Sequence, residues 1–380
     1  MTAQSEQSRR IRVGVLFGGR SAEHEISLIS ARNIIEGFDS QRYEVIPIGI
    51  DREGRWRLAR DARRMLVDAG KSLPVFSDRT PEDLGLIPGE AEQLAFAHNA
   101  SGDSPPALDV VFPVLHGPFG EDGSMQGLLK ILNLPFVGPG VAGSAVGMDK
   151  DLMKRLLRDA GIPIGRFRSV HAHRRAEIIY ADVTAELGSP VYVKPANMGS
   201  SVGISRVSTA DEFAAALDMA FAYDNKIIIE ESIIGREIEC AVLGNLGKMR
   251  ASVPGEIIPR DGWYSYQAKY FDENGAALRM PADMKPDSVK ALQDLSIRTC
   301  EILELEGMTR VDVFLTADGE ILINEVNTIP GFTGISMYPK LWELSGMPLS
   351  DLLHELVSQA LERHRREAGL RIDADGPAST

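Results

Sequence analysis

The feature that most restricts the fold of this chain is an acidic hairpin over residues 310–331, RVDVFLTADGEILINEVNTIPG. Two runs of alternating polarity flank Asp318-Gly319, a dipeptide that favours a tight hairpin turn. Closing the hairpin there predicts four cross-strand pairs: Leu315–Leu322, Val313–Asn324, Asp312–Glu325 and Arg310–Asn327. Because side chains alternate between the faces of a sheet, the last two pairs share one face, which should also carry Phe314 and Ile323.

Two opposed carboxylates on a partly covered face repel each other, which costs roughly 0.2–1 kcal/mol and more if they are buried. A hard divalent cation such as Mg²⁺ between Asp312, Glu325 and the amide oxygen of Asn327 would remove this repulsion, and Mg²⁺ is normally shared with substrate phosphates. Arg310 beside them could hold a further anion. The alternative is an ordinary solvated hairpin with incidental charges.

The 380 residues are enough for two or three domains, and Asp plus Glu exceed Lys plus Arg by 13. Such an acidic chain is a poor candidate for nucleic-acid binding, so any phosphate must be held locally. The two cysteines, Cys240 and Cys300, have no metal-site spacing and suggest buried thiols in a reducing compartment. With neither a membrane-spanning apolar run nor the core of a signal peptide, we expect a cytoplasmic protein without a membrane partner.

Two strand ends near the N-terminus carry polar residues. A strand over residues 11–17 leads through Gly18-Gly19 into a helix, and Glu23 lies in its first turn. This unit lacks the third glycine of a dinucleotide fingerprint. Glu23 either complements the helix dipole or meets the ammonium group of a ligand. A second strand, residues 109–115, ends at His116, which as a lone histidine is more typical of a structural hydrogen-bonder.

A second group of candidate residues follows in the middle of the chain. We expect residues 52–106 to be irregular decoration and a domain boundary near Asp149. Lys194 precedes a loop rich in Gly and Ser, residues 195–203, that could wrap phosphates although it is no Walker loop. A strand ending at Glu230-Glu231 could read an adenine edge and a ribose. Residues 255–284 depart from a regular pattern and predict either a lid or a surface hairpin.

Taken together, these motifs carry a family resemblance. They occur in the order GGRSAEHEIS, HGPFGEDG, MDK, VKPANMGSSVGIS, IIEE with GREIE, YQAKYF, RVDVF and NEVNTIPGFTGISMYP, and they span residues 11–360 except for about 52–106. The chain resembles the D-alanine–D-alanine ligases of the ATP-grasp superfamily. The resemblance implies an α/β (α+β ATP-grasp) fold with three domains: an N-terminal open parallel-sheet domain (1–148), a central domain (149–254) and a C-terminal domain with lid and metal hairpin (255–380).

The resemblance also implies the reaction and its ligands. ATP would phosphorylate the carboxylate of one D-alanine, and the amine of a second D-alanine would attack the acyl phosphate, giving the dipeptide for peptidoglycan precursors. Asp312, Glu325 and Asn327 would hold two Mg²⁺ ions, for which Mn²⁺ could substitute. The implied ATP-binding residues are Lys150, Lys194, Ser200, Ser201, Glu230, Glu231, Ile233, Glu237 and Lys269. We further expect a homodimer.

The implied catalytic residues come from four separate motifs. Glu23 would hold the ammonium group of the first D-alanine, and Arg310 with the Gly331 N–H would stabilise the oxyanion. Ser336, with Met337, would hold the carboxylate of the second D-alanine. Ser200, Tyr270 and Glu23 would form a hydrogen-bonded network that closes the lid. The polar residue before Glu325, Asn324, should face away from the metals in the predicted register, so it does not weaken the resemblance.

Three other functions compete with this one. A depsipeptide-forming relative would use D-lactate as its second substrate, or the chain could be another ATP-grasp carboxylate–amine ligase; YQAKYF and Glu23 favour the dipeptide enzyme. A nucleotide-binding regulatory protein would have no need to retain Arg310, Asp312 and Lys269. An NAD-dependent dehydrogenase fails on the missing glycine and leaves the acidic hairpin unexplained.

Overall fold

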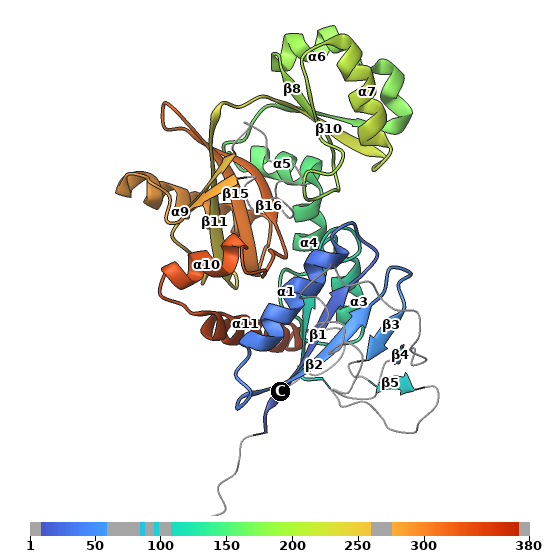
Figure 1. Cartoon of the computed structure of the whole chain (residues 1–380), viewed down its shortest axis with the longest axis vertical. Coiled ribbons are helices and arrows are strands. Elements are labelled where there is room, and N and C mark those ends of the chain that lie inside the picture. The colour runs from blue at the N-terminus through green and yellow to red at the C-terminus, as the bar shows by residue number, and fades with distance from the viewer. Residues whose placement is uncertain (1–8, 59–83, 88–94, 99–107, 260–275, 372–380) are drawn as a thin grey trace, which may run out of the picture.

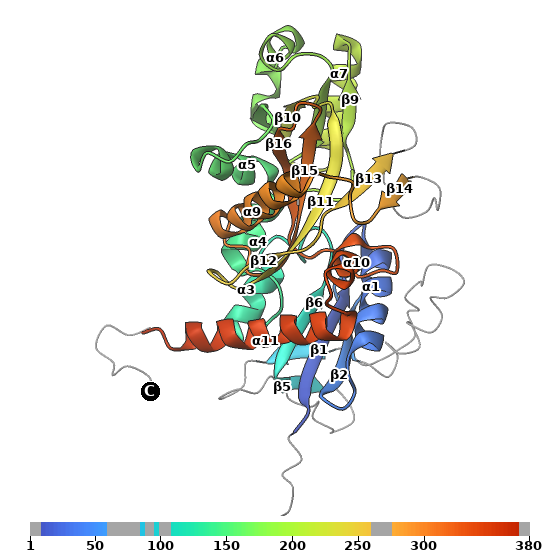
Figure 2. The same cartoon turned by 90° about the vertical axis from the view of Figure 1, so that its left-hand side faces the viewer.

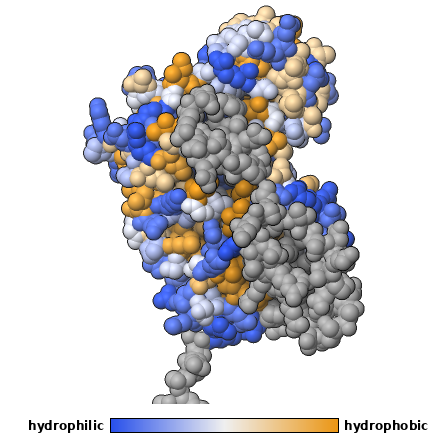
Figure 3. Space-filling model, in the orientation of Figure 1, coloured by the Kyte–Doolittle hydropathy of each residue, from blue (hydrophilic) through white to orange (hydrophobic). Residues whose placement is uncertain are grey.

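The computed structural model describes residues 9–58, 84–87, 95–98, 108–259 and 276–371. These residues form three larger sheets and one two-stranded sheet, with helices packed against them (Figure 1). The face in Figure 3 carries hydrophilic residues with scattered hydrophobic ones between them. None of the helices in the described part of the chain combines the length and apolar character needed to cross a bilayer. The fold is the mixed α/β class that the resemblance predicts.

The N-terminal sheet has the order β3-β2-β1-β6. Its strands β1 (Ile11–Gly18), β2 (Tyr43–Ile50) and β6 (Val110–Val114) are parallel, and β3 (Trp56–Leu58) adds an antiparallel edge. The helices α1 (His24–Gly37) and α3 (Ser124–Ile131) follow β1 and β6. The prediction of wholly irregular structure over residues 52–106 was wrong, since β3 joins this sheet and β4 (Leu84–Ile87) pairs with β5 (Ala95–His98). Strands this short lack the alternation that would reveal them in the sequence.

The central sheet is antiparallel and has the order β7-β10-β8-β9. Its strands are β7 (Phe167–His171), β8 (Val191–Pro195), β9 (Ser205–Val207) and β10 (Lys226–Glu231). The helices α6 (Tyr180–Leu187) and α7 (Ala210–Phe221) share a buried apolar cluster with these strands, and the short helix η1 (Ala172–Glu177) follows β7. The helices α4 (Val141–Met148) and α5 (Lys150–Asp159) connect it to the N-terminal sheet.

The C-terminal sheet has the order β14-β13-β11-β15-β16, with β12 (Arg250–Ala251) paired to β11. Its other strands are β11 (Gly235–Gly244), β13 (Gly255–Pro259), β14 (Ala276–Arg279), β15 (Gly307–Thr316) and β16 (Ile321–Asn327). Because β11 belongs to this sheet, the sheet begins before residue 254. The three predicted domain ranges stay a prediction.

Residues 255–284 are more regular than expected, because β13 and β14 form an antiparallel pair at the edge of the C-terminal sheet. The residues between them, 260–275, lie outside the described residues, and so do Lys269 and Tyr270. The prediction of a lid therefore stays a prediction, although the regular flanks correct the expectation that the whole segment is irregular.

Three helices complete the fold: α9 (Pro286–Ile302), α10 (Met337–Leu344) and α11 (Leu349–Ala368). The helix α11 contacts α1 and β6 on one side and β11 and β15 on the other, so it joins the N-terminal and C-terminal sheets (Figure 2). Its buried Arg363 donates hydrogen bonds to the carbonyl oxygens of Phe136 (2.8 Å) and Gly138 (2.5 Å). These bonds attach α11 to the chain that follows β6.

The hairpin of β15 and β16 confirms half of the predicted register. Arg310 pairs with Asn327 and Asp312 with Glu325, but beyond a bulge Val313 pairs with Ile323 and Leu315 with Ile321. The predicted pairs Val313–Asn324 and Leu315–Leu322 were therefore wrong. Ile323 and Val326 are both buried in one apolar cluster, yet a spacing of three residues would place them on opposite faces of a regular strand.

The bulge resolves this conflict by giving β16 one extra residue. Ile323 consequently lies on the core face with Val313, and the prediction that it shares a face with the carboxylates was wrong. The prediction for Asn324 was wrong for the same reason, because Asn324 lines a cavity beside Glu325 and Phe314.

Candidate active site

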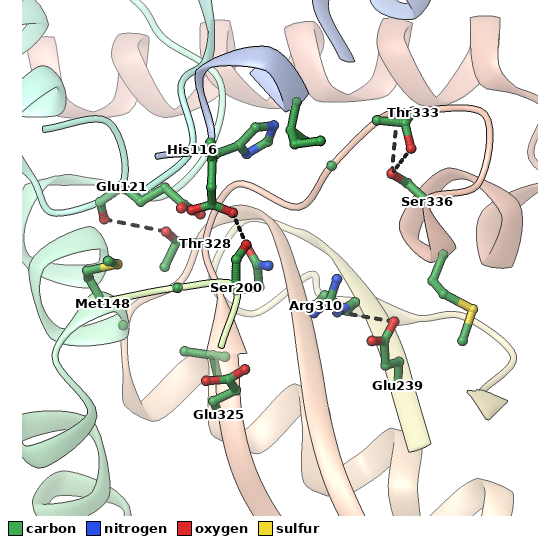
Figure 4. A pocket seen from close by; sticks show the side chains of 18 of the residues that line it. His116, Glu121, Met148, Ser200, Glu239, Arg310, Glu325, Thr328, Thr333 and Ser336 are labelled. Atoms are coloured by element: carbon green, nitrogen blue, oxygen red, sulfur yellow. Dashed lines mark hydrogen bonds and ion pairs between the residues drawn. The ribbon is translucent and has the colours of Figure 1, made fainter. Parts of the chain in front are cut away.

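Two adjoining cavities lie above the open face of the C-terminal sheet. The N-terminal cavity, about 130 Å³, lies between the ends of β1 and β6 and the C-terminal sheet, and Figure 4 shows its wall. The central cavity, about 420 Å³, lies between the central and C-terminal sheets. The residues that line both are Lys150, Gly199, Ser200, Ile257 and Glu325. The two cavities therefore meet at a lysine, a carboxylate and a Gly-Ser loop.

The structure brings most of the predicted residues to these cavities. The predicted residues in the wall of the N-terminal cavity are Glu23, Lys150, Ser200, Arg310, Glu325, Asn327, Gly331 and Ser336. Those in the wall of the central cavity are Lys150, Lys194, Ser200, Ser201, Glu230, Glu231, Ile233, Glu237 and Glu325. Asp312 lines neither cavity but contacts Arg310. Lys269 and Tyr270 lie outside the described residues.

A hydrogen bond from Ser200 Oγ to Glu23 Oε1 links the N-terminal helix α1 to the loop after β8 (Figure 4). Ser200 and Ser201 have φ angles of 52° and 59°, so both lie in the left-handed region that ordinary residues avoid. A Cβ atom on Gly199 would lie 3.1 Å from Glu23 Oε2, so a side chain here would be a tight fit against the Glu23 carboxylate. The strained loop thus approaches Glu23 closely and places the Ser200 hydroxyl on it.

Arg310 lines the N-terminal cavity and is partly buried. Its Nε and Nη2 donate to both oxygens of Asp312 at 2.7 Å, and its Nε lies 3.2 Å from Glu239 Oε2. Burial alone would lower the pKa of Arg310, but Asp312 and Glu239 outweigh burial and raise it well above its ordinary value. A permanently charged guanidinium is therefore fixed where it can face a developing negative charge.

Glu325 lies at the junction of the cavities and 3.2 Å from Lys150 Nζ, which also donates to the Met198 carbonyl at 2.8 Å. Across the hairpin Glu325 faces Asp312, and Asn327 is two residues along the same strand. The Oδ1 atom of Asn327 is buried and has no hydrogen-bond partner in the described part of the chain.

This donor set fits a hard cation only in part. A buried amide oxygen without a partner and two opposed carboxylates are suitable Mg²⁺ ligands. On the other hand, Arg310 and Lys150 already pair with these carboxylates, and the described residues contain no group of three His, Cys, Asp or Glu residues arranged for a metal. Two protein oxygens with waters and phosphate oxygens would suffice for Mg²⁺, which keeps much of its hydration.

Glu230 lies between two lysines in the central cavity. Lys154 Nζ is 2.9 Å from its Oε1 and Lys194 Nζ is 2.5 Å from its Oε2. Burial would raise the pKa of Glu230, but the two ammonium groups outweigh burial and lower it to about 2. Burial likewise lowers the pKa of Lys194, and the charges of Glu230 and Glu325 outweigh it and raise that pKa. Glu230 and Lys194 therefore both stay charged at neutral pH.

The comparisons with known proteins show the family of this chain. The family model described as D-ala D-ala ligase N-terminus matches residues 12–139, and that described as D-ala D-ala ligase C-terminus matches residues 156–358. The D-alanine–D-alanine ligase of Shouchella clausii is 50% identical over 361 residues, which cover 95% of this chain and 97% of that protein. The chain belongs to the D-alanine–D-alanine ligase family. This confirms the family resemblance stated from its motifs.

Other ligases are similar to this chain over nearly its whole length. D-alanine–D-alanine ligase A of Escherichia coli K12 is 47% identical and covers 95% of this chain and 99% of its own. Among solved structures, the D-alanine–D-alanine ligase of Coxiella burnetii has a TM-score of 0.81 at 38% identity, covering 94% and 96% of the two chains. The VanG D-Ala:D-Ser ligase of Enterococcus faecalis has a TM-score of 0.79 at 32% identity, covering 93% and 100%.

The charged residues that line the two cavities and that the sequence analysis did not single out are Glu121, Lys154, Arg236, Glu239 and Glu256. Lys154 follows Lys150 by one helical turn of α5, a spacing that could have placed both on one face. Glu239 follows Glu237 by two residues in β11, which predicts a shared face. Glu121 lies in the quoted HGPFGEDG motif, but nothing in that motif shows that its side chain turns inward.

Glu121 and His116 hold the segment after β16 in place. Glu121 accepts hydrogen bonds from the N–H groups of Gly117 (2.6 Å) and Ile329 (3.0 Å), and His116 Nδ1 lies 3.0 Å from the Ile329 carbonyl oxygen. Burial, with the nearby charge of Glu23, raises the pKa of Glu121 to about 8. Burial also lowers the pKa of His116. The structural interpretation of His116 is therefore confirmed, although His116 lines the cavity as well.

Proposed function

We propose that this protein is an ATP-dependent ligase that joins two D-alanine molecules into D-alanyl-D-alanine for peptidoglycan precursors. The observation that carries the proposal is the meeting of two unlike cavities at Lys150 and Glu325. The central cavity offers lysines to a phosphate chain, and the N-terminal cavity offers the carboxylate of Glu23 and the guanidinium of Arg310 to an amino acid. A reaction that moves a phosphoryl group onto an amino-acid carboxylate needs both kinds of wall side by side.

The central cavity would bind ATP. Lys150 and Lys194 would contact its phosphates, and the Gly-Ser loop that includes Ser200 and Ser201 would cover them. Ile233 with Glu230 and Glu231 would surround the adenine, and Glu237 would accept from the ribose. Because Lys154 and Lys194 keep Glu230 ionised, its role would combine an acceptor for the adenine with a counter-charge for the phosphate lysines.

Asp312, Glu325 and Asn327 would hold Mg²⁺, or Mn²⁺ in its place. The ions, when bound, would neutralise the phosphate oxygens during transfer. The side chains themselves determine where this happens. Glu325 borders both cavities and Asn327 borders only the N-terminal one, so the phosphoryl group would pass at the junction.

The N-terminal cavity would bind the two D-alanine molecules. Glu23 would hold the ammonium group of the first, leaving its carboxylate toward Lys150. That carboxylate oxygen would bond to the γ-phosphorus of ATP while ADP leaves. The deprotonated amine of the second molecule would then attack the carbonyl carbon, forming the C–N bond as phosphate leaves. Arg310 and the N–H of Gly331 would face the oxygen on which negative charge develops.

Ser336, at the start of α10, would hold the carboxylate of the second D-alanine. Its Oγ accepts from the Thr333 N–H at 3.0 Å and lies 2.8 Å from Thr333 Oγ1, so its position is fixed. Lys269 and Tyr270 of the loop between β13 and β14 would complete the site over the γ-phosphate and Ser200. A cytoplasmic homodimer remains part of the proposal.

The test is ADP release from Mg·ATP with D-alanine alone, and with D-alanine plus D-lactate or D-serine. Formation of D-alanyl-D-alanine at the rate of ADP release supports the proposal. Rapid release with a depsipeptide or D-alanyl-D-serine as the main product would assign the chain to one of the related ligases. D-alanine-independent binding of ATP without turnover would instead indicate a regulatory protein.

A further inference from the structure

Lys154 is a buried lysine of the central cavity that contacts no substrate in the proposed reaction. It lies on α5 one helical turn after Lys150, and only 3% of its side chain is exposed. Its Nζ atom lies 2.9 Å from Glu230 Oε1, and Glu230 is its ion-pair partner within the described part of the chain. A buried ammonium group is costly unless it is paired, so the position of Lys154 depends on Glu230.

Glu230 has a second lysine partner, which ATP would draw away. Lys194 Nζ lies 2.5 Å from Glu230 Oε2, and the charge of Glu325 at the junction of the cavities also acts on Lys194. A triphosphate carries more negative charge than one carboxylate, so Lys194 is expected to turn toward it. Lys154 is enclosed more tightly, with 3% of its side chain exposed against 12% for Lys194, and the preceding residue Met153 is fully buried. With ATP bound, Lys154 would therefore be the partner that Glu230 retains.

The Oε1 atom of Glu230 can still accept a hydrogen bond from a ligand. This atom is buried in a residue that lines the central cavity, and it accepts no hydrogen bond from the described residues, since its contact with Lys154 is an ion pair only. The 6-amino group of adenine can donate to such an oxygen, whereas the 6-oxo group of hypoxanthine or guanine is an acceptor and would be repelled. A carboxylate kept charged at this place therefore favours adenine over the 6-oxo purines.

We propose that Lys154 is a positioning residue: it keeps the Glu230 carboxylate charged and in place when Lys194 turns to the phosphates, and thereby makes the cavity select ATP over 6-oxo purine nucleotides. This inference rests on the proposed function and adds to it a residue that determines nucleotide specificity through another residue. A direct contact between Lys154 and the phosphates predicts something different, because its loss would weaken the use of every nucleoside triphosphate equally.

The test compares ATP with ITP, which has a 6-oxo group in place of the 6-amino group, in D-alanine ligation by Lys154→Met. Methionine keeps an unbranched side chain and removes the charge. The ratio of kcat/KM for ATP to kcat/KM for ITP should fall about tenfold to a hundredfold, which corresponds to the loss of one hydrogen bond to a charged group. The KM of D-alanine should change less than about twofold. An unchanged ratio, with or without a lower kcat/KM for both nucleotides, would overturn the inference.

A second variant and a double variant keep the test decisive. If Lys154→Met does not fold, Lys154→Gln removes the charge but keeps a donor for Glu230, and a wild-type ratio in this variant overturns the inference. In a Glu230→Gln background, Lys154→Met should cause no further change in the ratio, because Lys154 acts through Glu230. A further tenfold fall in that background would indicate a direct contact of Lys154 with the base and would also overturn the inference.

The matched control is Lys226→Met, which removes a similarly buried lysine that binds Asp149 and lines neither cavity. Its ratio should equal that of the wild type. A fall as large as that of Lys154→Met would show that any lost lysine of this domain lowers the ratio, which contradicts a specific role of Lys154. A wild-type protein that ligates D-alanine with neither nucleotide would instead contradict the proposed function.

Discussion

The two cavities differ in size and in the charges that line them. The central cavity is about three times as large as the N-terminal one (420 against 130 Å³) and is lined by the lysines Lys150, Lys154 and Lys194 together with several carboxylates. The N-terminal cavity is lined by the carboxylates Glu23, Glu121, Glu239 and Glu325, with Arg310 among them. The large cavity thus has the room and the lysines for a phosphate chain, and the small one has charges of both signs for a zwitterion.

The difference shows why one sheet can serve two reactions. The face of the C-terminal sheet is continuous, but its two sides are covered by different parts of the chain: the central sheet and α5 bring lysines, and the N-terminal loops bring Glu23 and His116. Charges of opposite sign pair within each cavity, as Glu230 does with Lys154 and Lys194, and the two cavities meet at Lys150 and Glu325, 3.2 Å from each other. Variants on each side should therefore affect different substrates.

The largest effect is expected at the junction. Glu325→Gln removes a proposed metal ligand shared by both cavities, so kcat should fall at least about a thousandfold at saturating ATP and D-alanine. The substitution also relieves the repulsion with Asp312, so the free energy of unfolding without metal should change by no more than about 1 kcal/mol. Steady-state kinetics and thermal melting check these values. Normal Mg²⁺-dependent turnover would contradict the site assignment.

A smaller effect is expected in the central cavity alone. Lys194→Ala should raise the KM of ATP by about tenfold to a hundredfold, because a charged hydrogen bond to the phosphates is lost. The KM of D-alanine should change little. The matched control is Lys226→Ala on the neighbouring strand β10, which removes a similarly buried lysine bound to Asp149 at 2.5 Å. This control should lower the melting temperature without a selective change in the KM of ATP.

The next largest effect is expected at the hydrogen bond between Ser200 and Glu23, which joins the loop after β8 to the start of α1. Ser200→Ala should lower kcat up to about tenfold and raise the KM of the first D-alanine, since Glu23 loses the hydroxyl that positions it. The comparison is Ser201→Ala, because Ser201 lines only the central cavity and should affect only the KM of ATP. Equal effects of the two variants on D-alanine would show that Ser200 does not act through Glu23.

Substitution of Glu121 should have the smallest effect on activity, but it should change how the free energy of unfolding depends on pH. The pKa of Glu121 in the folded state is about 8, above its ordinary value of 4.5. Between pH 4.5 and about 8, the folded state therefore holds a proton that the unfolded state has lost. This contribution to stability is complete below about pH 4.5 and is lost as the pH rises through about 8. Glu121→Gln cannot titrate, so its free energy of unfolding should decline less over this range, as chemical denaturation at several pH values would show.

Local pattern alone predicted much of the fold. The Asp318-Gly319 turn, the alternation in β15, the apolar runs of β1, β2, β6 and β10, and the amphipathic helix α11 follow from side-chain periodicity and turn chemistry. The family also followed from the sequence, because many motifs occur together in one order. The short strands in residues 52–106 could not be predicted, since three or four residues carry too little periodicity.

Only the tertiary structure shows which residues that are far apart in the sequence lie together. The bulge at Asn324 depends on the burial of both Ile323 and Val326, which requires the apolar cluster beneath the sheet. The Ser200–Glu23 bond spans 177 positions, and Arg310 meets Glu239 only because β11 lies beside β15. Periodicity is a property of neighbours in sequence, whereas burial and charge pairing depend on which strands lie side by side. The sequence by itself therefore determined the elements and the family, and packing decided which charges share a cavity.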